Sequence, residues 1–322
     1  MTRLGYQIPN FTYPDATGAD IFSTVIDQAK AAEAAGFDRV FVMDHFYQLP
    51  GLGAPTEPMF ECYTALSALA QHTETVRLSA LVTGNTYRNP ALLAKTVTAL
   101  DHVSGGRATL GIGAGWFELE HDSLGFDFGT FTDRFEKLEE ALQIIIPLLR
   151  GETVSFDGEH YQVSDAFNSP PPISRIPIMI GGAGEKKTLR MVAQYADESN
   201  LVGTPTAEIP RKLDALAAHC ERLGRDRSEI TVTNMLMVCV APTMEEAEAD
   251  VREIAAAKGW PDEVVEMVKG ILVFGDPDTV GEQVAACMAT GVDGITFNLP
   301  ANGHNTDRIG LLGEIGLAAT AG

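Results

Sequence analysis

The sequence alternates eight times between a short apolar run and a segment with apolar residues at helical spacing. Because strands that alternate with helices pair in parallel, this order predicts an α/β fold. Eight units, with no change of composition to mark a linker, favour a (β/α)8 TIM barrel over an open doubly wound sheet, and we expect residues 1–322 to form one domain. The predicted strands lie at 3–9, 39–43, 77–83, 108–112, 178–180, 197–202, 230–240 and 294–299.

Two segments fall outside the repeating unit. Residues 153–163 alternate around Asp157-Gly158, a pattern typical of a hairpin, and they follow the long amphipathic helix predicted at 133–149. Two helical segments, 244–257 and 262–269, follow the seventh strand without a strand between them. The predicted barrel therefore carries insertions after unit four and after strand seven.

Charge and cysteine content restrict the partners of the protein. The 44 acidic and 23 basic residues give a net charge of −21, which disfavours binding to nucleic acid and to anionic membranes. No window is long and apolar enough to span a membrane, and the N-terminus lacks an apolar signal core. The four cysteines are scattered, without metal-ligand spacing, so we expect reduced thiols and no metal. These features predict a cytoplasmic protein that acts on a small molecule.

In such a barrel the active site lies at the C-terminal ends of the strands. The residues there include neither a carboxylate pair suited to glycosidic chemistry nor a Ser-His-Asp arrangement. Glycine follows strands four and five, where it lets a ligand approach the backbone, so the ends favour a planar or phosphorylated cofactor. The strand-end residues are Asp44-His45, 83–85, 113–117, 181–184, 203–204 and Asn298.

The fifth strand runs into a glycine-rich turn, Gly181-Gly182-Ala183-Gly184, before a helix predicted over 185–193. Free backbone N–H groups at such a turn can bind a phosphate. An ordinary strand-to-helix turn has the same composition, so both interpretations stay open. The nearby positive charges are Lys186, Lys187 and Arg190.

His45 is the single histidine directly after a predicted strand, with Asp44 beside it. Imidazole titrates near neutral pH, so His45 is the natural general acid or base. A rim histidine with a structural hydrogen bond is the alternative. His121 is expected at the surface.

Trp116 and Phe117 are consecutive, so at least one is expected to face the pocket mouth as an apolar substrate wall; packing in the core is the alternative. Met235, Met237 and Val238 are expected in the core. The mouth therefore combines aromatic rings with few charges.

Five stretches together resemble the luciferase-like monooxygenase superfamily, and within it the branch that uses the deazaflavin coenzyme F420. The resemblance spans nearly the whole chain. It implies a barrel with a flavin or deazaflavin at its C-terminal mouth, the cofactor phosphate on Gly181–Gly184, and a homodimer. The stretches are 31–46, 81–95, 106–128, 176–197 and 275–284.

The same resemblance implies roles for individual residues. It implies a cis peptide near Ala80-Leu81, behind the cofactor ring, and it implies that His45 lies at the hydride-transfer centre. In sugar-phosphate dehydrogenases of this branch an acidic residue occupies the position of Trp116, so a substrate less polar than glucose 6-phosphate is expected here. The implied cofactor-lining residues also include Asp44, Thr83 and Asn85, and Gly113 is expected beside the cofactor as the glycine that ends strand four.

The expected function is therefore an F420-dependent oxidoreductase that transfers a hydride to or from a small, weakly polar substrate. One alternative is an FMN-dependent monooxygenase that uses reduced FMN and O2 and depends on a separate flavin reductase. A second alternative is a barrel that binds a flavin without turning it over. The substrate itself and the direction of transfer do not follow from the sequence.

Overall fold

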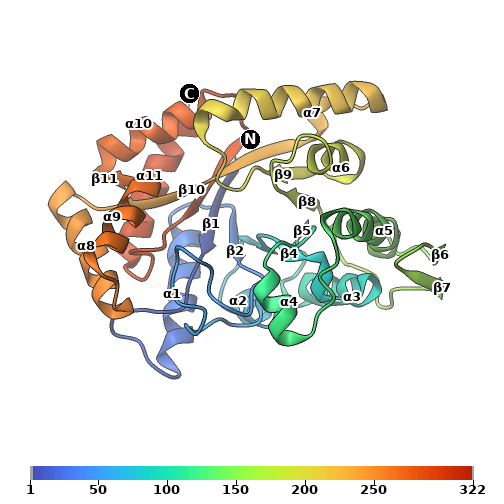
Figure 1. The fold of residues 1–322 in the computed structure, drawn as a ribbon, viewed down its shortest axis with the longest axis horizontal. Helices are drawn as coiled ribbons and strands as arrows, with labels where there is room; N and C mark the ends of the chain where they lie inside the picture. The colour runs from blue at the N-terminus through green and yellow to red at the C-terminus, as the bar shows by residue number, and fades with distance from the viewer. Residues whose placement is uncertain (1–2, 321–322) are drawn as a thin grey trace.

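Eight parallel strands close into a barrel in the computed structural model, which describes residues 3–320 (Figure 1). Each strand pairs with the next along the chain, and the last pairs with the first. The predicted (β/α)8 fold is confirmed. The barrel consists of β1 (Arg3–Ile8), β2 (Arg39–Val42), β3 (Arg77–Ala80) with β4 (Thr83–Gly84), β5 (Leu110–Gly113), β8 (Ile178–Gly181), β9 (Glu198–Asn200), β10 (Thr231–Val240) and β12 (Gly294–Asn298).

The third barrel strand is interrupted. β3 and β4 are two parts of it, and Leu81 and Val82 between them are joined by a cis peptide bond. This is one bond beyond the position that the family resemblance implied. The barrel closes here because β4 pairs with β5 and because Leu78 bridges to Ala108.

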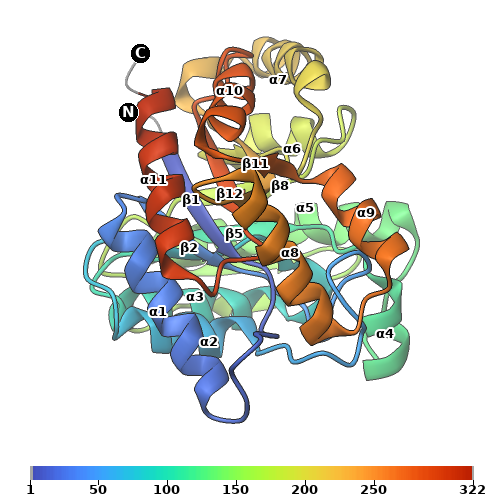
Figure 2. The same ribbon diagram turned by 90° about the vertical axis from the view of Figure 1, so that its left-hand side faces the viewer.

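Amphipathic helices cover the outside of the barrel and bury their apolar faces against it, and α1 packs beside α11 (Figure 2). Helix α3 shows how the sequence determines where a helix begins. Pro90 occupies the first helical position, and the Asn89 side chain accepts a hydrogen bond from Ala91 N at 2.9 Å. The outer helices are α1 (Asp20–Ala34), α2 (Cys62–Ala70), α3 (Pro90–Val103), α5 (Phe131–Leu149), α6 (Thr188–Tyr195), α7 (Ile209–Leu223), α10 (Pro277–Met288) and α11 (Thr306–Thr320).

The remaining elements lie between barrel units. The antiparallel hairpin of β6 (Val154–Asp157) and β7 (Gln162–Ala166) projects beyond α5 (Figure 1). After β10 come two helices and β11, which pairs in parallel with β10 and was not predicted. The other bounds are α4 (Glu118–Leu124), α8 (Met244–Lys258), α9 (Asp262–Ile271), β11 (Val273–Gly275) and the 3-10 turns η1 (Asn85–Tyr87), η2 (Thr206–Glu208) and η3 (Arg227–Glu229).

Helix α6 begins at Thr188, three residues later than the sequence analysis predicted. Residues 185–187 form a turn instead, and Glu185 pairs there with Lys212 of α7 at 2.8 Å. The extra turn separates the glycine segment from the helix.

Gly111 on β5 is a position where barrel closure leaves no room for a side chain. A Cβ atom there would lie 2.1 Å from the carbonyl oxygen of Ala80, and backbone cannot rotate away. We expect Gly111→Ala to lower the free energy of unfolding by about 2–3 kcal/mol, as overpacking does in cores. Gly310→Ala on α11, where nothing lies within 4 Å, should be neutral or stabilising by up to about 1 kcal/mol. Denaturant titrations of both variants test this, and equal effects would contradict it.

Candidate active site

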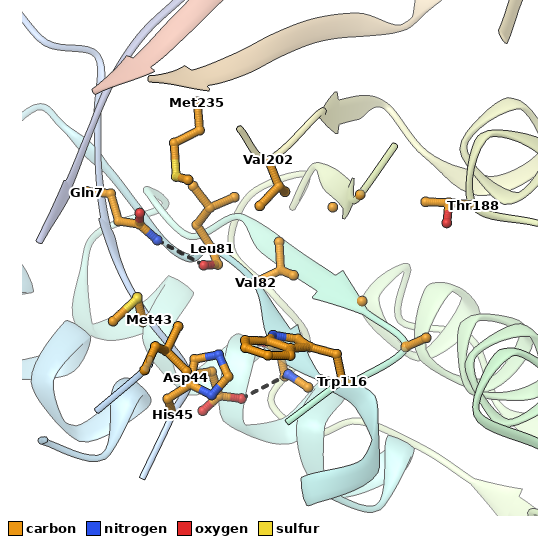
Figure 3. Close-up of a pocket in the computed structure, with 18 of the residues that line it drawn as sticks. Gln7, Met43, Asp44, His45, Leu81, Val82, Trp116, Thr188, Val202 and Met235 are labelled. Atoms are coloured by element: carbon orange, nitrogen blue, oxygen red, sulfur yellow. Dashed lines mark hydrogen bonds between the residues drawn. The ribbon is translucent and has the colours of Figure 1, made fainter. Parts of the chain in front are cut away.

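A cavity of about 590 Å³ opens at the C-terminal ends of the barrel strands, where the sequence analysis places the active site. Its lining comes from strands on all sides of the barrel, including Gln7 on β1, Met235 on β10 and Asn298 on β12. Figure 3 shows His45 and Trp116 on one side of the lining and Met235 on the other, with Leu81 and Val82 in the view between them. The lining is mostly apolar, as in sites for organic cofactors and substrates.

The wall formed by Leu81 and Val82 is held by a chain of side-chain amides. Gln7 Nε2 donates to Leu81 O at 3.0 Å, and Asn298 Nδ2 donates to Gln7 Oε1 at 2.7 Å. The buried Oδ1 of Asn298 has no partner within the described residues. This orphaned acceptor, on a residue that lines the cavity, suits an N–H donor on a ligand.

Two of the predicted cofactor-binding glycines make room for Val82. A Cβ atom on Gly113 would lie 3.0 Å from Val82 Cγ2, and one on Gly181 would lie 2.7 Å from Val82 Cγ1. A side chain at either position would press on Val82, which also lines the cavity. Both glycines line the cavity, so their lack of a side chain leaves Val82 its place in the cavity wall.

Asp44 is buried at the edge of the cavity and pairs with Arg88 in a bidentate contact of 2.6 and 2.9 Å. It also accepts a hydrogen bond from Gly84 N at 3.1 Å. Burial raises the pKa of Asp44, and the Arg88 guanidinium opposes that rise. Its carboxylate therefore holds the loops after β2 and β4 together.

His45 lies beside a second buried carboxylate, that of Glu120 on α4. His45 Nδ1 is 2.9 Å from Glu120 Oε2, which also accepts from the Tyr87 hydroxyl. Glu120 Oε1 accepts from the backbone N–H groups of Phe46 and, at 2.9 Å, Tyr47. The side chain of Glu120 is fully buried, and its two oxygens are thus shared among four donors.

Glu120 is ionised in this setting. Burial raises its pKa, but the hydrogen bonds from His45, Tyr87 and the backbone together outweigh burial and lower the pKa below its usual range. An ionised carboxylate only accepts hydrogen bonds, so His45 Nδ1 carries the proton that it donates. The other ring nitrogen, Nε2, is then free to exchange a proton with a ligand.

The sequence analysis did not identify Glu120. It lies two residues after Glu118, which is exposed on the same helix, and nothing local distinguishes the two carboxylates. The expected surface position of His121 was wrong as well. His121 is buried, 2.7 Å from Thr86 Oγ1 and 2.8 Å from Phe117 O, because α4 packs onto η1.

The two aromatic residues after β5 differ in exposure. Trp116 lines the cavity with 58% of its surface exposed, whereas Phe117 is buried beneath it. Both rings lie 5.8 Å from the His45 ring, centroid to centroid. The expectation that Met235 and Met237 lie in the core was wrong, since both line the cavity.

The other predicted site residues divide between the cavity and its surroundings. Thr83 lines the cavity and pairs with the Tyr63 hydroxyl at 2.6 Å. Asn85 is buried near Tyr161, 3.4 Å away, outside the lining. Their roles toward a cofactor stay predictions. Of the remaining predicted residues, Leu81 and Gly182 line the cavity, and Ala80, Ala183 and Gly184 do not.

The three cationic side chains near the glycine segment differ in their contacts. Arg190 is paired with Glu139 at 2.6 Å, while Lys186 is exposed. Lys187 Nζ lies 5.3 Å from the centre of the Phe131 ring, at the cavity. Within residues 3–320 no cluster of His, Cys, Asp and Glu could hold a metal ion, and none of the described helices is long and apolar enough to cross a membrane.

The fold and this cavity define a TIM-barrel enzyme whose site lies at the mouth of the barrel. Residues 2–294 match the sequence pattern described as luciferase-like monooxygenase. The chain belongs to this family.

Individual relatives place the chain among cofactor-dependent enzymes. It is 28% identical over 316 residues to an F420-dependent glucose-6-phosphate dehydrogenase of Nakamurella multipartita, covering 91% of each chain. It is 32% identical over 227 residues to a pyrimidine monooxygenase of Stutzerimonas stutzeri, covering 68% of this chain and 61% of the relative. A solved F420-dependent secondary alcohol dehydrogenase, in complex with an F420-acetone adduct, shares the fold with a TM-score of 0.80 at 20% identity over 99% of both chains.

The ionised state of Glu120 makes its contribution to stability depend on pH. Its folded-state pKa is lowered, so the contribution is present above the unfolded value of about 4.3 and is lost as the pH falls through the folded-state value. We expect Glu120→Gln to cost about 2 kcal/mol at pH 7, because an amide cannot accept from all four donors. The cost should shrink in acid.

The matched control is Glu118→Gln on the exposed face of the same helix, which should track the unsubstituted protein at every pH. Urea titrations between pH 7 and pH 3 provide the measurement. A cost for Glu120→Gln that does not change with pH would show that the carboxylate is not ionised as described.

Proposed function

We propose that the protein is a coenzyme F420-dependent oxidoreductase that transfers a hydride between F420 and a small, weakly polar organic substrate. The observation that carries this proposal is His45, whose Nδ1 is bound by the buried Glu120 carboxylate and whose Nε2 is left for a ligand at the cavity. The similarity to an F420-dependent dehydrogenase along 91% of the chain supports the choice of cofactor.

The residues around the cavity fit a deazaflavin. Leu81 and Val82 would support the ring from behind, and Asn298 Oδ1 would accept a hydrogen bond from a ring N–H. The segment Gly181–Gly184 would meet the phosphate with backbone N–H groups, and Lys187, three residues further along the chain, would add positive charge. When bound, a deazaflavin supplies a ring carbon that accepts or gives a hydride.

The chain's own task is to hold the substrate and to move its proton. In the oxidation of an alcohol the O–H and C–H bonds break and a C=O bond forms. Nε2 of His45 would take the proton, and a cofactor held by Leu81, Val82 and Asn298 would supply the acceptor for the hydride with both electrons. The carboxylate of Glu120 stabilises the imidazolium that results, because it already accepts the Nδ1 proton. Reduction of a carbonyl compound follows the same path in reverse.

An FMN-dependent monooxygenase is the second candidate, favoured by the family itself and by the similarity to a pyrimidine monooxygenase. The same wall and glycines would accept an isoalloxazine ring. A separate reductase would then have to supply reduced FMN.

The cofactor is tested by paired titrations of the purified protein with oxidised F420 and with FMN, followed by the fluorescence of each. We expect binding of F420 to be at least about tenfold tighter, which corresponds to about 1.4 kcal/mol. A preference for FMN, followed by O2 consumption with reduced FMN, would overturn the proposal in favour of the monooxygenase. Binding without turnover of any alcohol or carbonyl compound would leave a flavin-binding barrel.

The role of His45 is tested by His45→Ala, which should lower kcat by roughly 10²- to 10⁴-fold, the usual contribution of a general acid or base. The affinity for F420 should change little, since Leu81, Val82 and Asn298 remain. His72→Ala, at an exposed histidine, is the control and should keep full activity. Turnover of His45→Ala at the unsubstituted rate would refute the assignment.

A further inference from the structure

We propose that the substrate is an uncharged alcohol or carbonyl compound with a hydrocarbon body, and not a phosphorylated sugar. The proposal names the substrate class for the cavity described above. For turnover it rests on the proposed function, but the binding preference is a property of the cavity walls. It can therefore be measured with and without the cofactor.

The outer part of the cavity is lined by large apolar side chains from separate elements. Trp116, Phe131 and Ile271 are 58%, 60% and 54% exposed, and all three line this cavity. They come from the loop after β5, the start of α5 and the end of α9. Exposed apolar side chains gathered at one concave site mark a surface that an apolar ligand covers. Leu49, Leu52 and Met237 extend the same wall.

Every charged side chain on the lining already has a protein partner. Asp44 is paired with Arg88, and His45 is bound to Glu120. Arg134 donates to Gly115 O at 3.2 Å and to Gly129 O at 3.1 Å, and its guanidinium lies 3.9 Å from the centre of the Phe128 ring. A phosphate group brought to the part of the wall formed by Trp116 and Ile271 would lose its hydration. The single arginine on the lining, Arg134, is already held by two carbonyl oxygens and the Phe128 ring, and Lys187, beside Phe131, lies outside the lining.

The polar group of the cavity, His45, lies next to its apolar wall. His45 offers Nε2, and the Trp116 ring lies beside it, edge to face at an angle of 72° (Figure 3). A ligand with one hydroxyl or carbonyl group can reach Nε2, and the rest of its body then lies against Trp116 and Ile271. A sugar would place several hydroxyl groups against the same apolar wall, where they would remain without partners.

Ile271 and Met267 provide a matched pair of variants. Both lie on α9, one helical turn apart, and both are 54% exposed, but Ile271 lines the cavity and Met267 does not. Because each side chain is half in solvent, substitution by serine should leave the fold intact. Ile271→Ser removes part of the proposed wall, and Met267→Ser changes the surface alone.

Binding is measured by displacement of the neutral fluorescent probe N-phenyl-1-naphthylamine from the protein, first without and then with F420. The competitors are the 2-alkanols from 2-propanol to 2-octanol and glucose 6-phosphate. We expect affinity to rise roughly fourfold for each methylene that packs on the wall, with no displacement by glucose 6-phosphate. Ile271→Ser should weaken 2-octanol binding by roughly fivefold or more, and Met267→Ser should change it by less than about twofold.

Turnover of the same compounds is then measured with F420, and kcat/KM should rise with the chain length of the 2-alkanols. Affinities that do not change with chain length, displacement by glucose 6-phosphate, or equal effects of the two variants would overturn the proposal. If the alkanol series behaves as expected but F420 does not bind, the cofactor assignment fails and the substrate class stands. If F420 binds and glucose 6-phosphate is the better substrate, the substrate class fails and the cofactor assignment stands.

Discussion

The carboxylate of Glu120 is the contact on which the arrangement of the site depends. It is fully buried and accepts hydrogen bonds from His45, Phe46, Tyr47 and Tyr87, so it joins the loops after β2, β4 and β5. A buried charge is tolerated only when donors satisfy it, and here the protein supplies all four. The same bonds that satisfy the charge fix the proton on Nδ1 of His45. Stability, and the proton transfer proposed for His45, therefore rest on one group.

A second buried carboxylate lies on the chain next to His45 but has a different environment. The carboxylate of Asp44 forms an ion pair with Arg88, which also pairs with Glu61 at 2.6 Å. The charge of Asp44 is therefore balanced within the protein. Glu120 has no Arg or Lys among its hydrogen-bond donors, and its pKa is lowered by the bonds from His45, Tyr87 and the backbone. A positive charge that forms on His45 is consequently stabilised by Glu120 in direct contact. The two carboxylates divide the work: Asp44 holds the loops, and Glu120 orients the imidazole.

The cavity combines a rigid inner part with an apolar outer part. The inner part is built from strand ends, where Gly113 and Gly181 approach Val82 so closely that a side chain on either would require Val82 to shift. The outer part is built from loops and from α9, which lies in the segment inserted after β10. Hydrogen bonds between neighbouring strands hold the strand ends rigidly, so a ring bound there has a fixed position. The loops can differ in sequence without disturbing the barrel. This separation is consistent with the proposed cofactor site at the strand ends and the proposed substrate wall on the loops and α9.

The sequence by itself indicated the barrel, because apolar runs that alternate with amphipathic helices bury their faces in a parallel sheet covered by helices, and a count of eight units favours closure of that sheet. It also placed His45, Asp44, Gly113 and Gly181 at strand ends, since the ends follow directly from the strand positions. It did not identify Glu120 or the burial of His121, because both depend on how α4 packs over η1, and local spacing makes Glu118 and Glu120 look alike. The position of the methionines on β10 at the cavity was not predicted for a similar reason. The alternation of side chains along the strand is visible in the sequence, but the barrel has to close before it is clear which face of the strand lines the cavity.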